Sequence, residues 1–315
     1  MDRQLCSSCG KPVEATSPQQ PGRLLCADCA ARSYRDRKGT WWATGAGVAL
    51  TAIFVVVVAL ISRSAPPTLD GATLVVVSVV LALVPAAIWI VVFYRQDSRE
   101  PEPKRMVLAV FILSALLARA VGIPLVEEVF RVGSWLAAGV LYHILGAVLV
   151  IGFTEQFLIY AAVRYSVYPT PEFDERVDGI IYGTAAGLGY ASLVNVQYVL
   201  QSGGLDLTAG VIRVAVTALA LASFGGLTGY FLGRCKFDDE PVWWMPAGLT
   251  LAATLNGLFV YALGEVSTTG IGLQGGGYNP WPGLILATVV AAVTFAALFY
   301  LIRRLAGRAP QAAGA

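Results

Sequence analysis

Several polar side chains interrupt long apolar stretches of this sequence. Glu155 and Gln156 follow one apolar run, and Asn195, Arg213 and Asn256 lie within three others. Polar groups in a hydrocarbon environment are costly, so they face the interior of a helix bundle and are the first candidates for a functional site. Glu155 could act as a general base. The three amides could donate hydrogen bonds to an oxyanion, which is the chemistry of peptide hydrolysis.

Glu155 needs protonation, an ion-pair partner or a metal at this depth. Arg213 and Arg119 are the candidate ion-pair partners, and a buried Glu–Arg pair that only fixes helix register is the alternative to a catalytic acid. His143, the only histidine, lies twelve residues before Glu155, about 18 Å away along a helix and on another face. Because a catalytic zinc normally needs imidazoles or several carboxylates, these residues do not favour a catalytic metal.

The elements that must position these side chains are predicted to be membrane helices. The chain is 57% hydrophobic and only 13% charged, whereas soluble domains are about 25% charged. Apolar runs long enough to cross a bilayer recur along the chain, so we expect an all-α polytopic membrane protein with about eight transmembrane helices. The expected spans are 41–62, 72–94, 106–126, 134–163, 178–201, 209–233, 242–263 and 281–302. The fourth is too long for one straight crossing, so it must tilt, kink or extend beyond the membrane.

Basic residues are distributed unevenly among the connecting segments. One set of alternate segments carries Arg95, Arg99, Lys104, Arg105, Arg164, Arg176, Arg234, Lys236, Arg303, Arg304 and Arg308. The other set carries only Arg63 and Arg131. The positive-inside rule therefore predicts a multi-pass protein of the plasma membrane with both termini in the cytoplasm. We expect no cleaved signal peptide, because the first residues are polar and include cysteine.

Four cysteines near the N-terminus have the spacing of a zinc ribbon. They form two CxxC knuckles separated by sixteen residues: Cys6, Cys9, Cys26 and Cys29. Two such knuckles predict a structural zinc held by four thiolates, and two disulfides are the alternative, which a reducing cytoplasm disfavours. Three parts are expected: a zinc-ribbon head over 1–40, a transmembrane bundle over 41–305 and a disordered tail over 306–315.

Small residues recur every four positions in two of the expected helices. The rows are Gly179, Gly183, Gly187 and Ala191, and then Gly225, Gly229 and Gly233. Such rows allow helix backbones to approach closely in lipid. We expect this packing to bring Asn195 near polar groups of neighbouring helices.

Four segments together resemble the PrsW family of intramembrane metalloproteases. They are YRQDSREPEPKR at 94–105, GFTEQFLIYAAVR at 152–164, PEFDERVDGIIYGTAAGLGYA at 171–191 and LTGYFLG at 227–233. The resemblance covers about residues 75 to 263. It implies a helical bundle, similar to the membrane proteases related to CAAX prenyl endopeptidases, whose catalytic glutamates and histidines meet within the membrane.

The resemblance also implies which positions would carry catalysis. The paired glutamates of the family, in an EExxK context, fall on Glu155 and Gln156, with Ile159 at the lysine position. The Glu-Asn pair expected on the next helix falls on Val194 and Asn195.

The two histidines of the family fall near Leu221 and on Asn256. Since most of the ionisable positions are replaced, we expect weakened or absent hydrolysis, with a membrane protein or peptide bound in the same cavity. The alternative is an active intramembrane protease with Glu155 as general base. The bilayer is the other expected partner. Neither a nucleic-acid partner nor a transporter is expected, because the basic residues are scattered in the head and the halves show no inverted repeat.

Overall fold

We analysed a computed structural model of the chain. It describes Pro12 and residues 26–62, 71–95, 102–202, 207–269 and 281–306. Every regular element in these ranges is a helix, which confirms the expected all-α fold. The first half contains α1 (Ala27–Ser62), α2 (Gly71–Tyr94), α3 (Lys104–Leu117), η1 (Ala118–Gly122), η2 (Leu125–Val129), α4 (Val132–Trp135) and η3 (Leu136–Ala138). The second half contains α5 (Val140–Leu145), η4 (Gly146–Gly152), α6 (Phe153–Ser166), α7 (Arg176–Ser202), α8 (Leu207–Phe237), α9 (Trp244–Thr269) and α10 (Trp281–Ala306).

Membrane-spanning segments account for most of these helices. Within the described ranges, six are long and apolar enough to cross a bilayer: Trp42–Ser62, Gly71–Tyr94, Lys104–Trp135, Val140–Ser166, Gly210–Phe237 and Trp244–Gly264. A shorter apolar helix, Thr288–Leu301, lies within α10. Each of these matches one of the eight expected spans, and the remaining span corresponds to α7.

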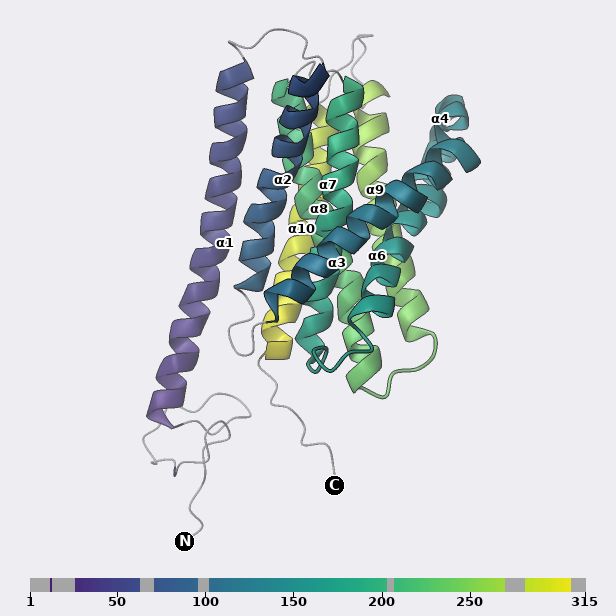
Figure 1. The fold of residues 1–315 in the computed structure, drawn as a ribbon. Coiled ribbons are helices and arrows are strands. Elements are labelled where there is room, and N and C mark those ends of the chain that lie inside the picture. The colour runs from purple at the N-terminus through teal and green to yellow at the C-terminus, as the bar shows by residue number, and fades with distance from the viewer. Residues whose placement is uncertain are drawn as a thin grey trace.

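The helix α7 occupies the centre of the bundle. It contacts α2, α3, α6 and α8, and all of its residues from Val177 to Ser192 are buried. Figure 1 shows α2, α7, α8, α9 and α10 running roughly upright, with α3 crossing them obliquely. Because α7 touches protein on every side, it can be rich in glycine and polar residues where a lipid-facing helix would have to be apolar.

The contact between α7 and α8 is made by the predicted glycine rows. A side chain at Gly183 would collide with the backbone carbonyl of Gly225, and one at Gly187 would collide with that of Leu221. These positions therefore require residues without a Cβ, and the predicted close approach of the two backbones is confirmed.

The helix α1 lies at the edge of the bundle (Figure 1). Only 6% of the residues in the apolar stretch of Trp42–Ser62 are buried, and α1 contacts α2 and α8. The packed side chains include Phe54, Val55 and Val58, which lie against a cluster that contains Val211 and Val214. The first residue of α1 and the last of α10 lie at the same end of the bundle in Figure 1, as an even number of crossings requires.

The predicted zinc-ribbon head is largely outside the described residues. Cys6 and Cys9 are not described, Cys26 directly precedes α1, and Cys29 lies in the first turn of α1. The helix α1 thus begins at Ala27, within the segment assigned to the head, while the predicted tail lies beyond the end of α10. The zinc ribbon stays a prediction.

The fourth expected span is not a straight helix. It leaves helical geometry at Gly139 and then continues from Val140 to Ser166 through α5, the π-helical η4 and α6. The third expected span is also longer than predicted, because the π-helical η1 and η2 carry it beyond α3. Glu155, in the first turn of α6, therefore follows a π-helical segment of the kind frequent at functional sites.

The start of α3 is tied to α2 and α7 through Glu102. The Tyr94 hydroxyl donates to the backbone carbonyl of Glu102 at 2.8 Å, and the Tyr182 hydroxyl donates to Glu102 Oε2 at 2.5 Å. Because Glu102 precedes α3 by two residues, these bonds fix where α3 begins its oblique path.

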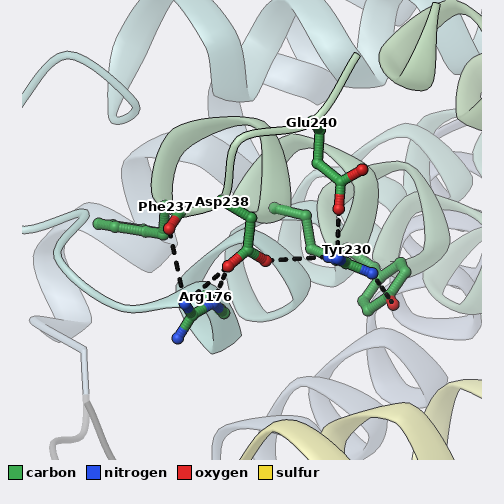
Figure 2. A network of polar contacts seen from close by, with 6 residues as sticks. Arg176, Tyr230, Phe237, Asp238 and Glu240 are labelled. Carbon is green, nitrogen blue, oxygen red and sulfur yellow. Dashed lines mark hydrogen bonds and ion pairs between the residues drawn. The ribbon is translucent and has the colours of Figure 1, made fainter. Parts of the chain in front are cut away.

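An ionic network joins the start of α7 to the end of α8 (Figure 2). Asp238 accepts from Arg176 at 2.7 Å and from Arg234 at 3.0 Å. Arg234 also pairs with Glu240. Lys236 donates to the carbonyls of Tyr168 and Phe173 in the loop before α7, at 2.7 and 2.6 Å.

The network predicts a pH-dependent stability. Hydrogen bonds from Arg176, and then from Arg234, hold the pKa of Asp238 below its ordinary value of 3.8. A depressed pKa means that the stabilisation is present above that value and is lost as the pH falls through the folded-state pKa. We expect Asp238→Asn to lower the unfolding free energy by about 1 kcal/mol at neutral pH, and this effect should shrink as the pH falls below 3.8 and through the folded-state pKa of Asp238. Denaturant unfolding in detergent tests this, with the exposed Asp239→Asn as the matched control.

The glycine contact predicts a position-specific loss of stability. Gly183→Val should cost about 3 kcal/mol, because the new side chain meets the carbonyl of Gly225 on a rigid neighbouring backbone. Gly45→Val in α1, where a Cβ would meet nothing within 4 Å, should leave the melting temperature in detergent nearly unchanged. Equal melting temperatures for the two variants would contradict this account of the α7–α8 contact.

Candidate functional site

A cavity of about 160 Å³ lies between η1, η2, η4, α6, α7 and α8. Its wall contains both apolar and polar side chains. The apolar ones include Ile123, Val126, Ile151 and Val194. The polar ones are Glu127, Glu155, Tyr190, Gln197, Tyr198, Gln201 and Arg213. The cavity thus brings Glu155 and Arg213, two of the predicted site residues, to one hollow.

One face of α7 forms a wall of this cavity. Tyr190, Val194, Gln197 and Gln201 all line it, and they follow one another at spacings of four, three and four residues. That spacing places side chains on a single helix face. The face could have been identified from the sequence by its period, although three of its four residues were not proposed as site residues.

The carboxylate of Glu155 accepts a hydrogen bond from Asn256 of α9. The Asn256 amide Nδ2 donates to Glu155 Oε2 at 2.7 Å, and both residues are buried. Two glycines permit this contact: a side chain at Gly152 would collide with the backbone carbonyl of Ala253, and one at Gly257 would collide with the backbone of Val148. The segment before Glu155 and the helix α9 therefore lie close enough for a short asparagine to reach the carboxylate.

The other two predicted amides bind elsewhere. Gln156 Oε1 accepts from the Thr228 hydroxyl of α8 at 2.9 Å. Asn195 Nδ2 donates to the backbone carbonyl of Val214 at 3.0 Å. Neither side chain lines the cavity, so both amides join helices to α8.

Arg213 has a different partner from the one expected. Its guanidinium lies 4.0 Å from the centre of the Tyr198 ring, and no ion pair joins it to Glu155 or to another residue of the described ranges. The carboxylate of Glu155 is bonded by an uncharged amide, and Arg213 remains a cation on the cavity wall.

Glu127 and Tyr190 are among the cavity residues that were not predicted from the sequence. Glu127 Oε1 accepts from Gln197 Nε2 at 2.7 Å, which joins η2 to α7. Tyr190 lies so close to Gly122 of η1 that a side chain at Gly122 would collide with the Tyr190 hydroxyl. Glu127 was missed because it falls just beyond the end of the predicted third span, which the structure extends.

His143 is remote from this arrangement. It is buried, lies beside Gly264 and packs edge-on against Tyr261 with ring centres 5.4 Å apart. Among the residues whose side chains are described, no group of three or more His, Cys, Asp or Glu is placed to hold a metal.

Comparison with known proteins assigns the chain to a family. The sequence profile of the PrsW family intramembrane metalloprotease matches residues 102–302. The chain belongs to the PrsW family. It is 32% identical over 178 residues to the Protease PrsW of Bacillus subtilis, a match that covers 56% of this chain and 77% of that protein. It is 29% identical over 172 residues to the Protease PrsW of Geobacillus kaustophilus, covering 54% and 72%. No solved structure matches it.

The PrsW family match and the apolar helices together identify an integral membrane protein. The family name also implies a metal, and the residues around Glu155 do not fit a zinc centre. Its neighbours are amides. Asn256 Oδ1 and Gln156 Nε2 are buried without a hydrogen-bond partner among the described residues, and only the first of these atoms is an oxygen that could ligate a metal. One carboxylate and one amide oxygen fall short of the three imidazole or carboxylate ligands of a catalytic zinc.

The Glu155–Asn256 hydrogen bond predicts energetic coupling between α6 and α9. Asn256→Leu should lower the unfolding free energy by about 1–3 kcal/mol, because it leaves the Glu155 carboxylate buried without its donor. Glu155→Met together with Asn256→Leu should cost less than the sum of the single changes. The control double-mutant cycle combines Glu155→Met with Thr228→Val. Because Thr228→Val removes a hydrogen bond to Gln156 and not to Glu155, we expect the two changes in unfolding free energy to add. Additivity in the first cycle would contradict the contact.

Proposed function

We propose that this PrsW-family protein binds a membrane-embedded peptide segment in the cavity beside Glu155 and hydrolyses it weakly or not at all. The observation that carries the proposal is the contact of Glu155 with the Asn256 amide, at a site without an imidazole. The cavity wall offers an apolar surface for a peptide in lipid and polar groups for its main chain. The scaffold for binding is present, and the groups for cleavage are mostly replaced.

Peptide hydrolysis requires a polarised water, a base for its proton and donors for the oxyanion. Glu155 could take the proton. Of the three amides expected to act as donors, Asn195 donates to the carbonyl of Val214 and Asn256 donates to Glu155 itself. The oxygen of Gln156 accepts from Thr228, and the Gln156 side chain does not line the cavity. This arrangement supports binding over catalysis.

An active protease with Glu155 as general base is the second candidate. It is favoured by Tyr190, whose buried ring lines the same cavity as Glu155 and whose hydroxyl could donate to an oxyanion in place of the amides. In this reading the protein would cleave membrane proteins without the ligands of a zinc site.

The membrane orientation and the head complete the proposal. The basic residues of the connecting segments support a protein with both termini in the cytoplasm. The four N-terminal cysteines support one structural zinc in the head, which would then lie on the cytoplasmic side.

Cleavage assays with the reconstituted protein test the proposal. The protein is placed in liposomes with a panel of single-span membrane proteins, and products are followed by mass spectrometry. We expect little or no product from the wild type and none from Glu155→Gln. Efficient cleavage by the wild type that is lost in Glu155→Gln would overturn the binding proposal in favour of the protease. A variant with Gln156→Glu, Val194→Glu, Leu221→His and Asn256→His, which places the family's ionisable groups at their positions, serves as the comparison for gained activity.

Metal analysis of the same preparation tests the head. We expect about one zinc per chain, lost when Cys6, Cys9, Cys26 and Cys29 are changed to serine. A zinc that survives the cysteine changes would place metal in the bundle.

A further inference from the structure

Arg213 is a cation on the cavity wall, and no anionic side chain of the described residues pairs with it. Its guanidinium rests on the Tyr198 ring at 4.0 Å, and it forms no hydrogen bond or ion pair within the part of the chain that the structure describes. Glu127 shares the cavity, but its Oε1 accepts from Gln197. By contrast, Arg176 and Arg234 each pair with Asp238.

The cavity is elongated along α7. Its α7 wall extends from Tyr190 to Gln201, which is about 16 Å along the helix axis and matches about five residues of extended chain. Glu155 shares the wall with Tyr190 near one end, and Arg213 stacks on Tyr198 nearer the other. The rise from Tyr190 to Tyr198 is about 12 Å, or three to four extended residues.

We infer that Arg213 is an anchor for a carboxylate of the bound peptide, so that the cavity selects membrane segments with an acidic residue close to their end. The inference rests on the proposed function, because it names what the peptide must carry. A guanidinium that lies over an aromatic ring keeps its planar set of N–H donors, and this set matches the two oxygens of a carboxylate. The selected carboxylate lies three to four residues from the part of the peptide beside Glu155.

A peptide carboxylate fits this cavity better than a lipid phosphate does. The amides of Gln197 and Gln201 on the wall suit the donors and acceptors of a peptide main chain. The cavity also reaches Glu155, which lies near the middle of the candidate membrane span Val140–Ser166, whereas lipid head groups lie outside the hydrocarbon core.

Peptide binding to the full-length protein in phosphatidylcholine nanodiscs tests the anchor. The probes are fluorescent, C-terminally amidated peptides with an apolar core of about 20 residues that end in a single Asp, Asn or Lys, so that the last side chain is the only group that differs in charge. We expect the wild type to bind the Asp peptide about tenfold more tightly than the Asn peptide. Arg213→Gln should abolish this difference, and Arg213→Glu should transfer the preference to the Lys peptide.

Arg164→Gln is the matched control. Arg164 also lies over a tyrosine ring, 4.1 Å from the centre of Tyr168, but it does not line the cavity. We expect this variant to keep the tenfold preference. Melting temperatures of all variants report folding, and Arg213→Lys, which keeps the charge, should retain a preference for the Asp peptide.

The outcomes separate the anchor from the proposed function. Equal binding of the Asp and Asn peptides to the wild type, or a preference that survives Arg213→Gln, overturns the anchor and leaves peptide binding intact. Absence of binding by every peptide overturns the proposed function itself. If phosphatidylglycerol in the nanodiscs removes the preference and stabilises the wild type but not Arg213→Gln, Arg213 binds lipid phosphate and the peptide anchor is overturned.

Discussion

Because lipid offers helices no hydrophobic reason to associate, α7 and α8 are held by direct contact of their backbones, at positions such as Gly183 and Gly225 where no side chain fits. The site depends on this contact in two ways. It positions α8 so that the carbonyl of Val214 accepts a hydrogen bond from Asn195 of α7. In the same position of α8, the hydroxyl of Thr228 donates to Gln156 of α6. It also sets the face of α7 that carries Tyr190 and Gln197 toward the cavity. A wider separation of the two helices would leave several amides without partners in a medium that supplies none.

Within the described residues, the side chains of Glu155 and Gln156 bond to uncharged partners. Glu155 is bonded by an amide, and Gln156 by a hydroxyl. Ionic pairs are instead gathered at the end of the bundle where α7 begins and α8 ends, around Asp238. This division suits a membrane protein, because charge pairs at the aqueous edge avoid the desolvation cost that the same pairs would have in hydrocarbon. Arg213 departs from the pattern, which is why it points to a ligand.

Much of the fold could be predicted from the sequence, because length and apolarity alone decide which segments cross a bilayer. The glycine rows also predicted the α7–α8 contact, since a four-residue spacing of small residues has one strong physical use in lipid. For the fourth span the sequence predicted a tilt, a kink or an extension beyond the membrane, and it did not indicate the break at Gly139.

The site was less predictable. Which way a buried amide faces depends on the rotation of its helix, and a one-residue change in position rotates a side chain by about 100 degrees. Asn195 and Val194 therefore point to different neighbours, α8 and the cavity. The pairing of Glu127 with Gln197 joins residues far apart in the chain and depends on the π-helical extension after α3, which no local pattern indicated. Of the polar residues proposed from the sequence for the site, only Glu155 and Arg213 line the cavity.

The edge helix α1 has a mechanical consequence. It runs unbroken for 36 residues, about 54 Å, from the turn that holds Cys29 to the far side of the bundle. Its Phe54 and Val58 pack on the same cluster as Val214 and Tyr198, and Tyr198 is the ring beneath Arg213. A straight rod held by few contacts moves as a unit. Any tilt of its first turns would therefore also displace Phe54 and Val58, which pack beside the cavity residue Tyr198.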